Sequence, residues 1–219
     1  MPKCRPLQHI SAEMYSYSQS NAYNMILYGA SGHARVIRDI IEAMGEHVSC
    51  LVDDNPDTNE LDGLPVVHRL QADEPVILSI GSNRVRKLLD RRHAGTVWGR
   101  AIHPSAIVSP SAQVDEGSVV MQGAILQAGT RIGRHCIVNT GAAIDHECQI
   151  GDFVHISPHA TLCGNVHVGE GSWVGAGSTV IQGIHIGRDC IIGAGSVVTR
   201  NIPDGYVAYG NPCHIRREA

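Results

Sequence analysis

An imidazole beside a carboxylate is the pair in this sequence best suited to moving a proton. His146 stands between Asp145 and Glu147, in the segment Ile144-Asp145-His146-Glu147-Cys148. An imidazole titrates near neutral pH and can accept the proton of an attacking amine. A carboxylate next to it orients the ring and stabilises the imidazolium that forms. The pair indicates general-base catalysis, with either acid as helper, although a lone histidine between acids is more often an ordinary surface residue.

A six-residue repeat would position this pair. From Ile102 to Val198 every sixth residue is aliphatic, without a break, and four residues after each comes a residue that is nearly always small or β-branched. A helix repeats near 3.6 and a strand at two, so a period of six indicates a solenoid of short flat strands and turns. Three hexads would close one triangular coil with the aliphatic side chains inside. Because His146 follows the inward-facing Ile144 by two residues, we expect it at a corner, pointing outward.

The first half of the chain has a different pattern, in which predicted strands end in glycine-rich or acidic segments. The carboxyl ends of parallel strands line one crevice in an open α/β sheet, and a helix that begins there offers its N–H groups to a phosphate. The glycine spacing is short of the full G-x-G-x-x-G fingerprint, and Asp53-Asp54 would also suit an ordinary turn. The three segments are Gly29-Ala30-Ser31-Gly32-His33, Asp53-Asp54 and Gly81-Ser82-Asn83.

Length and composition limit the possible functions. The 219 residues divide into a polar extension (1–24), a small Rossmann-like domain (25–95) and an all-β solenoid with a short basic tail (96–219). The net charge of -4 gives no basic field for nucleic acid, and no apolar run reaches the ~20 residues of a membrane span. The seven cysteines show no zinc-finger spacing, and their odd number favours a reducing cytoplasm.

Taken together, the motifs resemble those of the hexapeptide-repeat sugar acetyltransferases, which modify sialic acid or the nucleotide-linked amino sugars of bacillosamine synthesis. The resemblance covers residues 25–219. It implies a left-handed parallel β-helix, acetyl-CoA as co-substrate, a nucleotide-linked amino sugar as acceptor, a homotrimer and no metal. The residues that carry it are Tyr28-Gly29-Ala30-Ser31-Gly32-His33, Asp53-Asp54, Ile80-Gly81-Ser82-Asn83, Ile144-Asp145-His146-Glu147-Cys148 and the tail Gly210-Asn211-Pro212 with Ile215-Arg216-Arg217.

The resemblance also assigns roles to single residues. It makes His146 the catalytic base and Glu147 its helper, and it directs the Gly164 N–H toward the thioester carbonyl oxygen. His159 departs from the pattern, because a small residue is expected there. The implied acetyl-CoA-binding residues are Asn139, His155, Gly164, Ala176, Gly193 and Ala194. The implied nucleotide-sugar-binding residues are Gly29, Ser31, Gly32, His33, Asp53, Asp54, Gly81 and Asn83.

The main expectation is N-acetylation of the 4-amino group of a UDP-4-amino-4,6-dideoxy sugar. O-acetylation of sialic acid is the first alternative. A zinc carbonic anhydrase is another, because histidines 135, 155, 159 and 167 fall within two coils and related solenoids hold zinc with three histidines. An NAD-dependent oxidoreductase has less support, since no Tyr-x-x-x-Lys pair is present. A non-catalytic trimeric scaffold would need only the flat sides of the solenoid.

Overall fold

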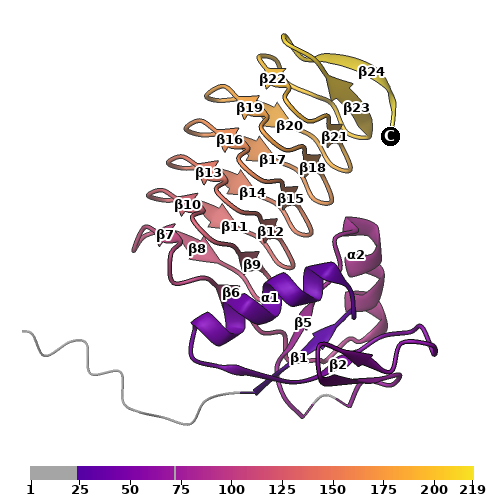
Figure 1. Ribbon diagram of the computed structural model, residues 1–219. Helices are drawn as coiled ribbons and strands as arrows, with labels where there is room; N and C mark the ends of the chain where they lie inside the picture. The colour runs from indigo at the N-terminus through magenta and orange to yellow at the C-terminus, as the bar shows by residue number, and fades with distance from the viewer. Residues whose placement is uncertain (1–23, 72) are drawn as a thin grey trace, which may run out of the picture.

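The computed structural model describes residues 24–71 and 73–219, so almost all of the predicted extension lies outside the described residues. An α/β unit at one end is followed by a stack of triangular coils (Figure 1). Both parts of the predicted fold, a Rossmann-like unit and a parallel β-helix of hexapeptide repeats, are confirmed. The predicted division near residue 95 falls in the segment between helix α2 (Asn83–Arg92) and strand β6 (Ala101–Ile102).

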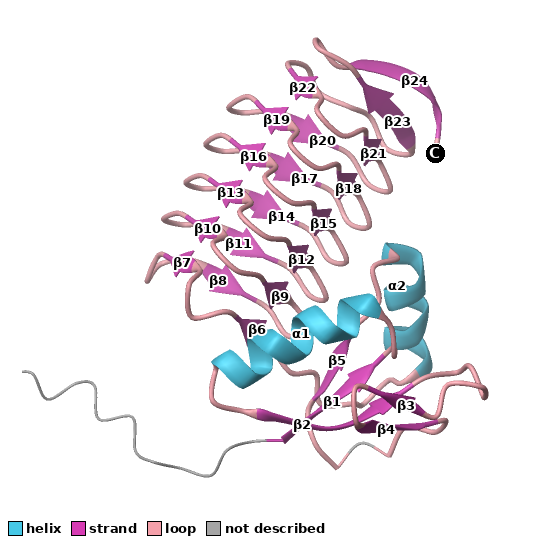
Figure 2. Cartoon of the chain, viewed as in Figure 1, coloured by secondary structure: helices cyan, strands magenta, loops and turns pink. Residues whose placement is uncertain are grey.

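The α/β unit is a five-stranded sheet with a helix on each face. Strand β1 pairs in parallel with β2 and β5, while β3 and β4 form an antiparallel pair at the edge. Helix α1 (Gly32–Ala43) buries Ala34, Ile37, Ile40 and Ile41 between the sheet and the solenoid, and α2 packs Leu89 on the other face (Figure 2). The sheet order is β3 (Glu60–Leu61), β4 (Leu64–Val67), β2 (His47–Val52), β1 (Asn24–Tyr28) and β5 (Val76–Leu78).

The coils stack in strict register, since each strand pairs with the strand 18 residues later, as Leu126 does with Ile144. Sheet 1 of the solenoid contains β6, β9 (Val119–Val120), β12 (Ile137–Val138), β15 (His155–Ile156), β18 (Trp173–Val174), β21 (Ile191–Ile192), β23 (Tyr206–Tyr209) and β24 (His214–Glu218). Sheet 2 contains β7 (Ile107–Val108), β10 (Ile125–Leu126), β13 (Ala143–Ile144), β16 (Thr161–Leu162), β19 (Thr179–Val180) and β22 (Val197–Val198). Sheet 3 contains β8 (Gln113–Val114), β11 (Arg131–Ile132), β14 (Gln149–Ile150), β17 (His167–Val168) and β20 (His185–Ile186).

The interior of the solenoid is built as the repeat predicts. From Val114 onward the aliphatic series is buried, and so are the small residues of the corners from Ser118 onward, including Cys136, Cys148 and Cys190. A narrow interior filled by branched aliphatic side chains accounts for the low aromatic content of 4%. The first residue of each two-residue strand points outward, so each sheet shows one column of side chains to its surroundings.

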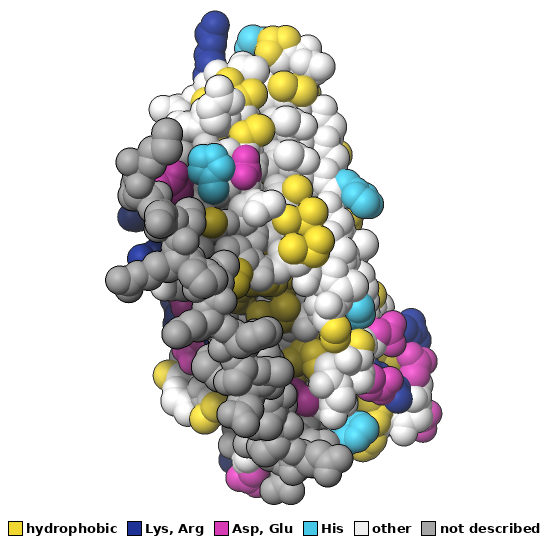
Figure 3. Space-filling model, turned by 90° about the vertical axis from the view of Figure 1, so that its left-hand side faces the viewer, with side chains coloured by type: hydrophobic (Ala, Val, Ile, Leu, Met, Phe, Trp, Pro, Cys, Tyr) yellow, Lys and Arg dark blue, Asp and Glu magenta, His cyan; other side chains and the backbone are white. Residues whose placement is uncertain are grey.

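The three outward columns differ in chemistry. The α/β unit covers the start of sheet 1, where Ala101, Val119 and Ile137 are buried against α1. Sheet 3 presents polar side chains such as Arg131 and His185. Sheet 2 is uncharged, and the side of the molecule that carries it shows few charged groups along the solenoid (Figure 3). Its outward residues are Ile107, Ile125, Ala143, Thr161, Thr179 and Val197.

Candidate functional site

His146 lies at the corner that joins sheets 2 and 3, with its side chain 57% exposed. Its Nδ1 lies 3.1 Å from Oε2 of Glu147, and because a carboxylate only accepts, Nδ1 carries the ring proton. Nε2 is thereby left as a free acceptor, which a general base requires. Asp145 instead accepts the backbone N–H of His146, at 2.8 Å. Of the two acids, the structure therefore places Glu147 beside the ring.

The ring of His146 lies against Gly164, one coil further on. A Cβ on residue 164 would stand 2.5 Å from both Nε2 and Cε1 of the imidazole, so only glycine leaves room for the ring there. Within residues 24–71 and 73–219 the Gly164 N–H donates no hydrogen bond. An imidazole nitrogen and a backbone N–H without a partner among the described residues therefore lie close together, and an acyl transfer needs a proton acceptor and a donor of this kind.

A second group of predicted residues lies on sheet 1 and at the corner that joins sheets 1 and 2. The Thr140 N–H donates to Asn139 Oδ1 at 2.8 Å, which turns the Asn139 amide nitrogen toward His155 Nε2, 3.1 Å away. His155 therefore accepts at Nε2 and carries its proton on Nδ1. Trp173 stacks on the His155 ring at 4.9 Å between centroids, and its Nε1–H donates to Ser157.

His155 is neutral at pH 7. Burial of the ring is the larger cause, and the nearby Arg86 guanidinium adds to it, so the pKa of His155 falls to about 3. The same two causes lower the pKa of His33, the second residue of α1, to about 4. Among these histidines, His146 is the one with an exposed ring and a carboxylate partner, which suits it to proton transfer.

The buried neutral state of His155 predicts a loss of stability in mild acid. The imidazole pKa is near 6.5 in the unfolded chain and about 3 in the folded one, so the unfolded state binds more protons below pH 7. Stability contributed by this group is lost as the pH falls from 6.5 toward 3. One pKa unit corresponds to about 1.4 kcal/mol, so through this group the wild type should lose roughly 2 kcal/mol of unfolding free energy between pH 7 and 5. His155→Gln lacks the imidazole and should not show this part of the loss. Urea unfolding at both pH values measures it. The exposed His185→Gln is the control, and an equal drop in all three proteins would contradict the prediction.

The predicted nucleotide crevice lies at the carboxyl ends of β1 and β2. Asp53 accepts the Ala30 N–H at Oδ2 (2.8 Å) and the Asn55 N–H at Oδ1 (2.9 Å), so it fixes the glycine turn. Gly29 has φ +116°, and a Cβ there would stand 2.9 Å from the Ser79 carbonyl oxygen. The glycine turn therefore has no room for a larger residue at this position.

One side of the crevice is closed by a charged clamp. Asp54 accepts from the Tyr28 hydroxyl at 2.6 Å and pairs with Arg92 at 2.7 Å. Burial and then the Asp54 carboxylate raise the pKa of Tyr28 to about 12, so the hydroxyl stays a donor. A hollow of about 250 Å³ lies beside this clamp, and Ile80 and Leu88 are among the side chains that line it.

The structure differs from the sequence-based expectation at Asn83 and at Arg86. Asn83 turns its amide into the solenoid, where it donates to the carbonyl oxygens of Gly171 and Ser172 at 2.9 and 3.1 Å. Arg86 is 1% exposed, although an arginine in a helix pattern normally predicts a surface position. The outward register of residue 173 could have identified Trp173, but no pattern marks Arg86.

The remaining predicted acetyl-CoA-binding residues are Ala176, Gly193 and Ala194. They lie at later corners between sheets 1 and 2, and a Cβ at Gly193 would stand 2.7 Å from Tyr209 Cβ.

The predicted catalytic and binding residues fall into two groups within one chain. Asn139 and His155 lie with the crevice on the sheet 1 side, whereas His146 and Gly164 lie at the far edge of sheet 2. Strand β13 runs between Asn139 and His146, so the width of the sheet separates the two corners. A hollow of about 310 Å³ beside Asp145 and Cys163 opens on this sheet.

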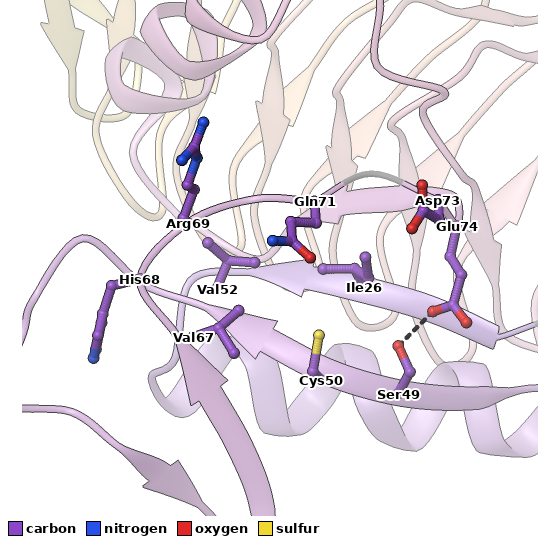
Figure 4. A pocket seen from close by; sticks show the side chains of 10 residues that line it. All are labelled: Ile26, Ser49, Cys50, Val52, Val67, His68, Arg69, Gln71, Asp73 and Glu74. Atoms are coloured by element: carbon purple, nitrogen blue, oxygen red, sulfur yellow. Dashed lines mark hydrogen bonds between the residues drawn. The ribbon is translucent and has the colours of Figure 1, made fainter.

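A hollow of about 510 Å³ lies on the α/β unit away from both groups (Figure 4). Its floor includes Ile26, Cys50 and Val67, and Ser49 donates to Glu74 at its rim. None of the residues singled out in the sequence lines it. In the described part of the chain no three His, Cys, Asp or Glu side chains gather as metal ligands. No helix there is long and apolar enough to span a membrane.

Comparison with known proteins agrees with this architecture. Residues 24–92 match the family model of the PglD N-terminal domain, and residues 165–200 match the bacterial transferase hexapeptide model of six repeats. The chain is 46% identical over 110 residues to UDP-N-acetylbacillosamine N-acetyltransferase of Bacillus subtilis (strain 168). That match covers 45% of this chain and 51% of the relative, so it spans about half the length of that protein.

Solved structures match nearly the whole chain. The acetyltransferase domain of PglB from Neisseria gonorrhoeae FA1090 is 36% identical, with a TM-score of 0.83 over 89% of this chain and 100% of that one. A mutant of perosamine N-acetyltransferase from Caulobacter crescentus, in complex with CoA and GDP-perosamine, is 40% identical, with a TM-score of 0.85 over 89% and 97% of the two chains. The chain therefore belongs to the family of hexapeptide-repeat sugar acetyltransferases that carry a PglD-type N-terminal domain.

Proposed function

We propose that the protein transfers the acetyl group of acetyl-CoA to the 4-amino group of a nucleotide-linked amino-deoxy sugar, with His146 as the general base. The observation that carries the proposal is the arrangement at the outer corner, where Glu147 orients His146 and the ring lies over Gly164. The relatives support the reaction class, because the Bacillus subtilis protein is named an N-acetyltransferase of a UDP-linked sugar and the Caulobacter crescentus complex holds CoA with GDP-perosamine. We also propose a cytoplasmic location for the protein, because its proposed co-substrate acetyl-CoA is supplied there.

The proposed chemistry is one nucleophilic substitution at a thioester carbonyl. As the amine nitrogen forms the C–N bond, His146 Nε2 takes the proton that the nitrogen loses. Glu147 stabilises the imidazolium, and the Gly164 N–H donates to the oxygen that becomes negative, which is typically worth about 3 kcal/mol. When the C–S bond breaks, His146 returns its proton to the departing thiolate, so the base is regenerated.

We further propose that the active site is composite and that three chains form a homotrimer. His146 and the Asn139–His155 pair lie at opposite edges of sheet 2, so one chain does not bring them to the same substrate. If sheet 2 faces a threefold axis, the outer corner of one protomer meets the crevice side of its neighbour. The uncharged outward column of sheet 2 is compatible with burial at such an axis.

The acceptor would occupy the crevice, where two helix N-termini and the buried Arg86 cation favour a diphosphate. Asp53 should govern its binding by bracing the glycine turn. We expect Asp53→Ala to raise the KM for the nucleotide sugar about tenfold, because a rigid turn is lost, while the Kd for acetyl-CoA stays the same. Steady-state kinetics and calorimetry measure the two quantities. A tenfold weaker acetyl-CoA binding, with the sugar KM unchanged, would contradict this assignment.

A thiol-release assay tests the proposed reaction. Wild-type protein with acetyl-CoA should turn over a UDP-, GDP- or dTDP-linked 4-amino sugar, and mass spectrometry should place the acetyl group on nitrogen. Sialic acid is the comparison acceptor, because O-acetylation of that sugar is the second candidate. Turnover of sialic acid, without turnover of any nucleotide sugar, would overturn the proposal.

A further inference from the structure

Helix α2 lies along three successive corners of the solenoid, where sheet 3 turns into sheet 1. Each corner has a residue with left-handed backbone, and these residues are 18 positions apart: His135 (φ 53°), Phe153 (φ 58°) and Gly171 (φ 73°). Their N–H groups donate to the preceding coil. In the ranges that the structure describes, no backbone N–H donates to their carbonyl oxygens. The solenoid thus presents three successive carbonyl groups to α2 that the ladder of coils does not use.

Two side chains of α2 bind all three carbonyl groups. Arg86 donates from Nε to His135 O and from Nη2 to Phe153 O, both at 3.0 Å. Asn83 donates to Gly171 O at 2.9 Å. Arg86 Nη2 also donates to Asn83 Oδ1 at 2.9 Å, which couples the two side chains. Since unpaired buried carbonyl groups are costly, these contacts fix where α2 can lie.

The repeat distances of helix and solenoid explain how the contacts stay in step. A helix advances about 5.4 Å per turn, and neighbouring strands lie about 4.8 Å apart, so side chains one turn apart meet successive coils. Lys87 pairs with Glu170 at one end of this contact. Asp90 accepts from Arg134 at 3.1 Å and lies 3.0 Å from His135 Nε2 at the other end. Ion pairs at both ends oppose a shift of α2 by one coil.

The same contacts reach the substrate crevice. Arg86 Nη1 donates to the carbonyl oxygens of Ile80 and Gly81 at 3.0 and 2.9 Å, so one guanidinium holds both the solenoid and the loop before α2. Asn83 in turn binds the carbonyl oxygens of Gly171 and Ser172, directly before Trp173, whose ring stacks on His155. The position of the acceptor crevice relative to His155 and Trp173 on sheet 1 is therefore set through Arg86 and Asn83.

We propose that Asn83 and Arg86 are positioning residues, which keep the acceptor crevice in register with Asn139 and His155 on the sheet 1 side without touching either substrate. This inference rests on the proposed function, since it concerns the alignment of an amine with a thioester. It reassigns Asn83, because its amide nitrogen and its oxygen are both engaged by protein groups. A misplacement of about 1 Å between reacting groups can cost about 100-fold in rate.

Asn83→Ala is the main test, because alanine at the first turn of α2 keeps the helix while removing the contacts to the solenoid. With both substrates saturating, kcat should fall about 10- to 100-fold, while the Kd values for acetyl-CoA and for the nucleotide sugar stay within about twofold. The kcat of Arg86→Lys should fall at least as far, since an ammonium group cannot span the carbonyl groups that the guanidinium group reaches. The exposed Arg91→Ala on the same helix is the control. All assays are run well below the melting temperature of each variant.

Two outcomes would overturn the inference. A higher KM for the nucleotide sugar with unchanged kcat would mean that Asn83 binds that substrate directly, and unchanged kinetics would mean that it has no role. Hydrogen exchange without substrates gives an independent measure, because amides of residues 80–92 should exchange at least about tenfold faster in Asn83→Ala than in Arg91→Ala. If the wild-type protein acetylates no amino sugar, the proposed function is wrong. The positioning role of Asn83 is tested separately, because unaltered hydrogen exchange of residues 80–92 in Asn83→Ala would reject it whatever the reaction is.

Discussion

Replacement of His146 by alanine is expected to lower kcat between about 10²- and 10⁴-fold, the range typical for the loss of a general base. The amine would have to lose its proton to water while the C–N bond forms. The KM for each substrate should change little, because the proton transfer belongs to the transition state alone. Stopped-time thiol release with saturating acetyl-CoA and nucleotide sugar measures the effect.

The control for this variant is His185→Ala, which removes an exposed imidazole from sheet 3 of the same solenoid. Its kcat should equal that of the wild type. The kcat of Glu147→Gln should lie between those of His146→Ala and His185→Ala, because the ring keeps a hydrogen-bond partner but loses the charge that stabilises imidazolium. A His146→Ala protein with full kcat would show that another group accepts the proton.

A single methyl group on Gly164 is expected to lower kcat about 100-fold or more. The added Cβ would stand 2.5 Å from two atoms of the His146 ring, so the imidazole must move and its alignment with the amine is lost. The backbone itself tolerates alanine, since the φ of Gly164 is not in the left-handed region. The melting temperature should therefore stay close to that of the wild type, which separates a displaced base from a damaged coil.

A control variant is Gly183→Ala, which lies at the same corner of the next coil, one position after the equivalent of residue 164. No side chain lies within 4 Å of the position that its Cβ would take, although its φ of +70° makes the substitution mildly strained. It should therefore lose a little stability and keep its activity. Equal loss of kcat in both variants would mean that the effect of Gly164→Ala comes from the coil and not from His146.

The repeat in the sequence predicts the solenoid well, because a period of six allows a single arrangement of inward positions. Ile144 is buried as the register requires, and His146, two residues later, points outward. The same register does not say which acid touches the imidazole. That depends on the left-handed backbone of Glu147, with φ +60°, which brings its carboxylate to the ring while Asp145 binds the main chain.

No local sequence pattern predicts the contacts between the α/β unit and the solenoid. The helix pattern predicts a surface position for Arg86, and the resemblance predicts a nucleotide-sugar contact for Asn83, yet both bind carbonyl groups 49 to 89 positions away in the sequence. The histidines differ for the same reason. His135 is buried between Trp98 and Phe153, and His155 is buried under Trp173, whereas His146 is exposed. Long-range packing decides these environments, and hence which imidazole is exposed to a substrate.

The most direct test of the account mixes two chains that are each impaired on a different side of the proposed composite site. One carries His146→Ala, and the other carries both Asp53→Ala and His155→Ala, so each lacks one of the two groups that line the proposed composite site. If neighbouring protomers share each site, equal co-expression should restore about a quarter of the wild-type kcat/KM for the nucleotide sugar per site, because about one junction in four pairs an intact His146 with an intact crevice. Activity no higher than that of the separate variants would contradict the composite site.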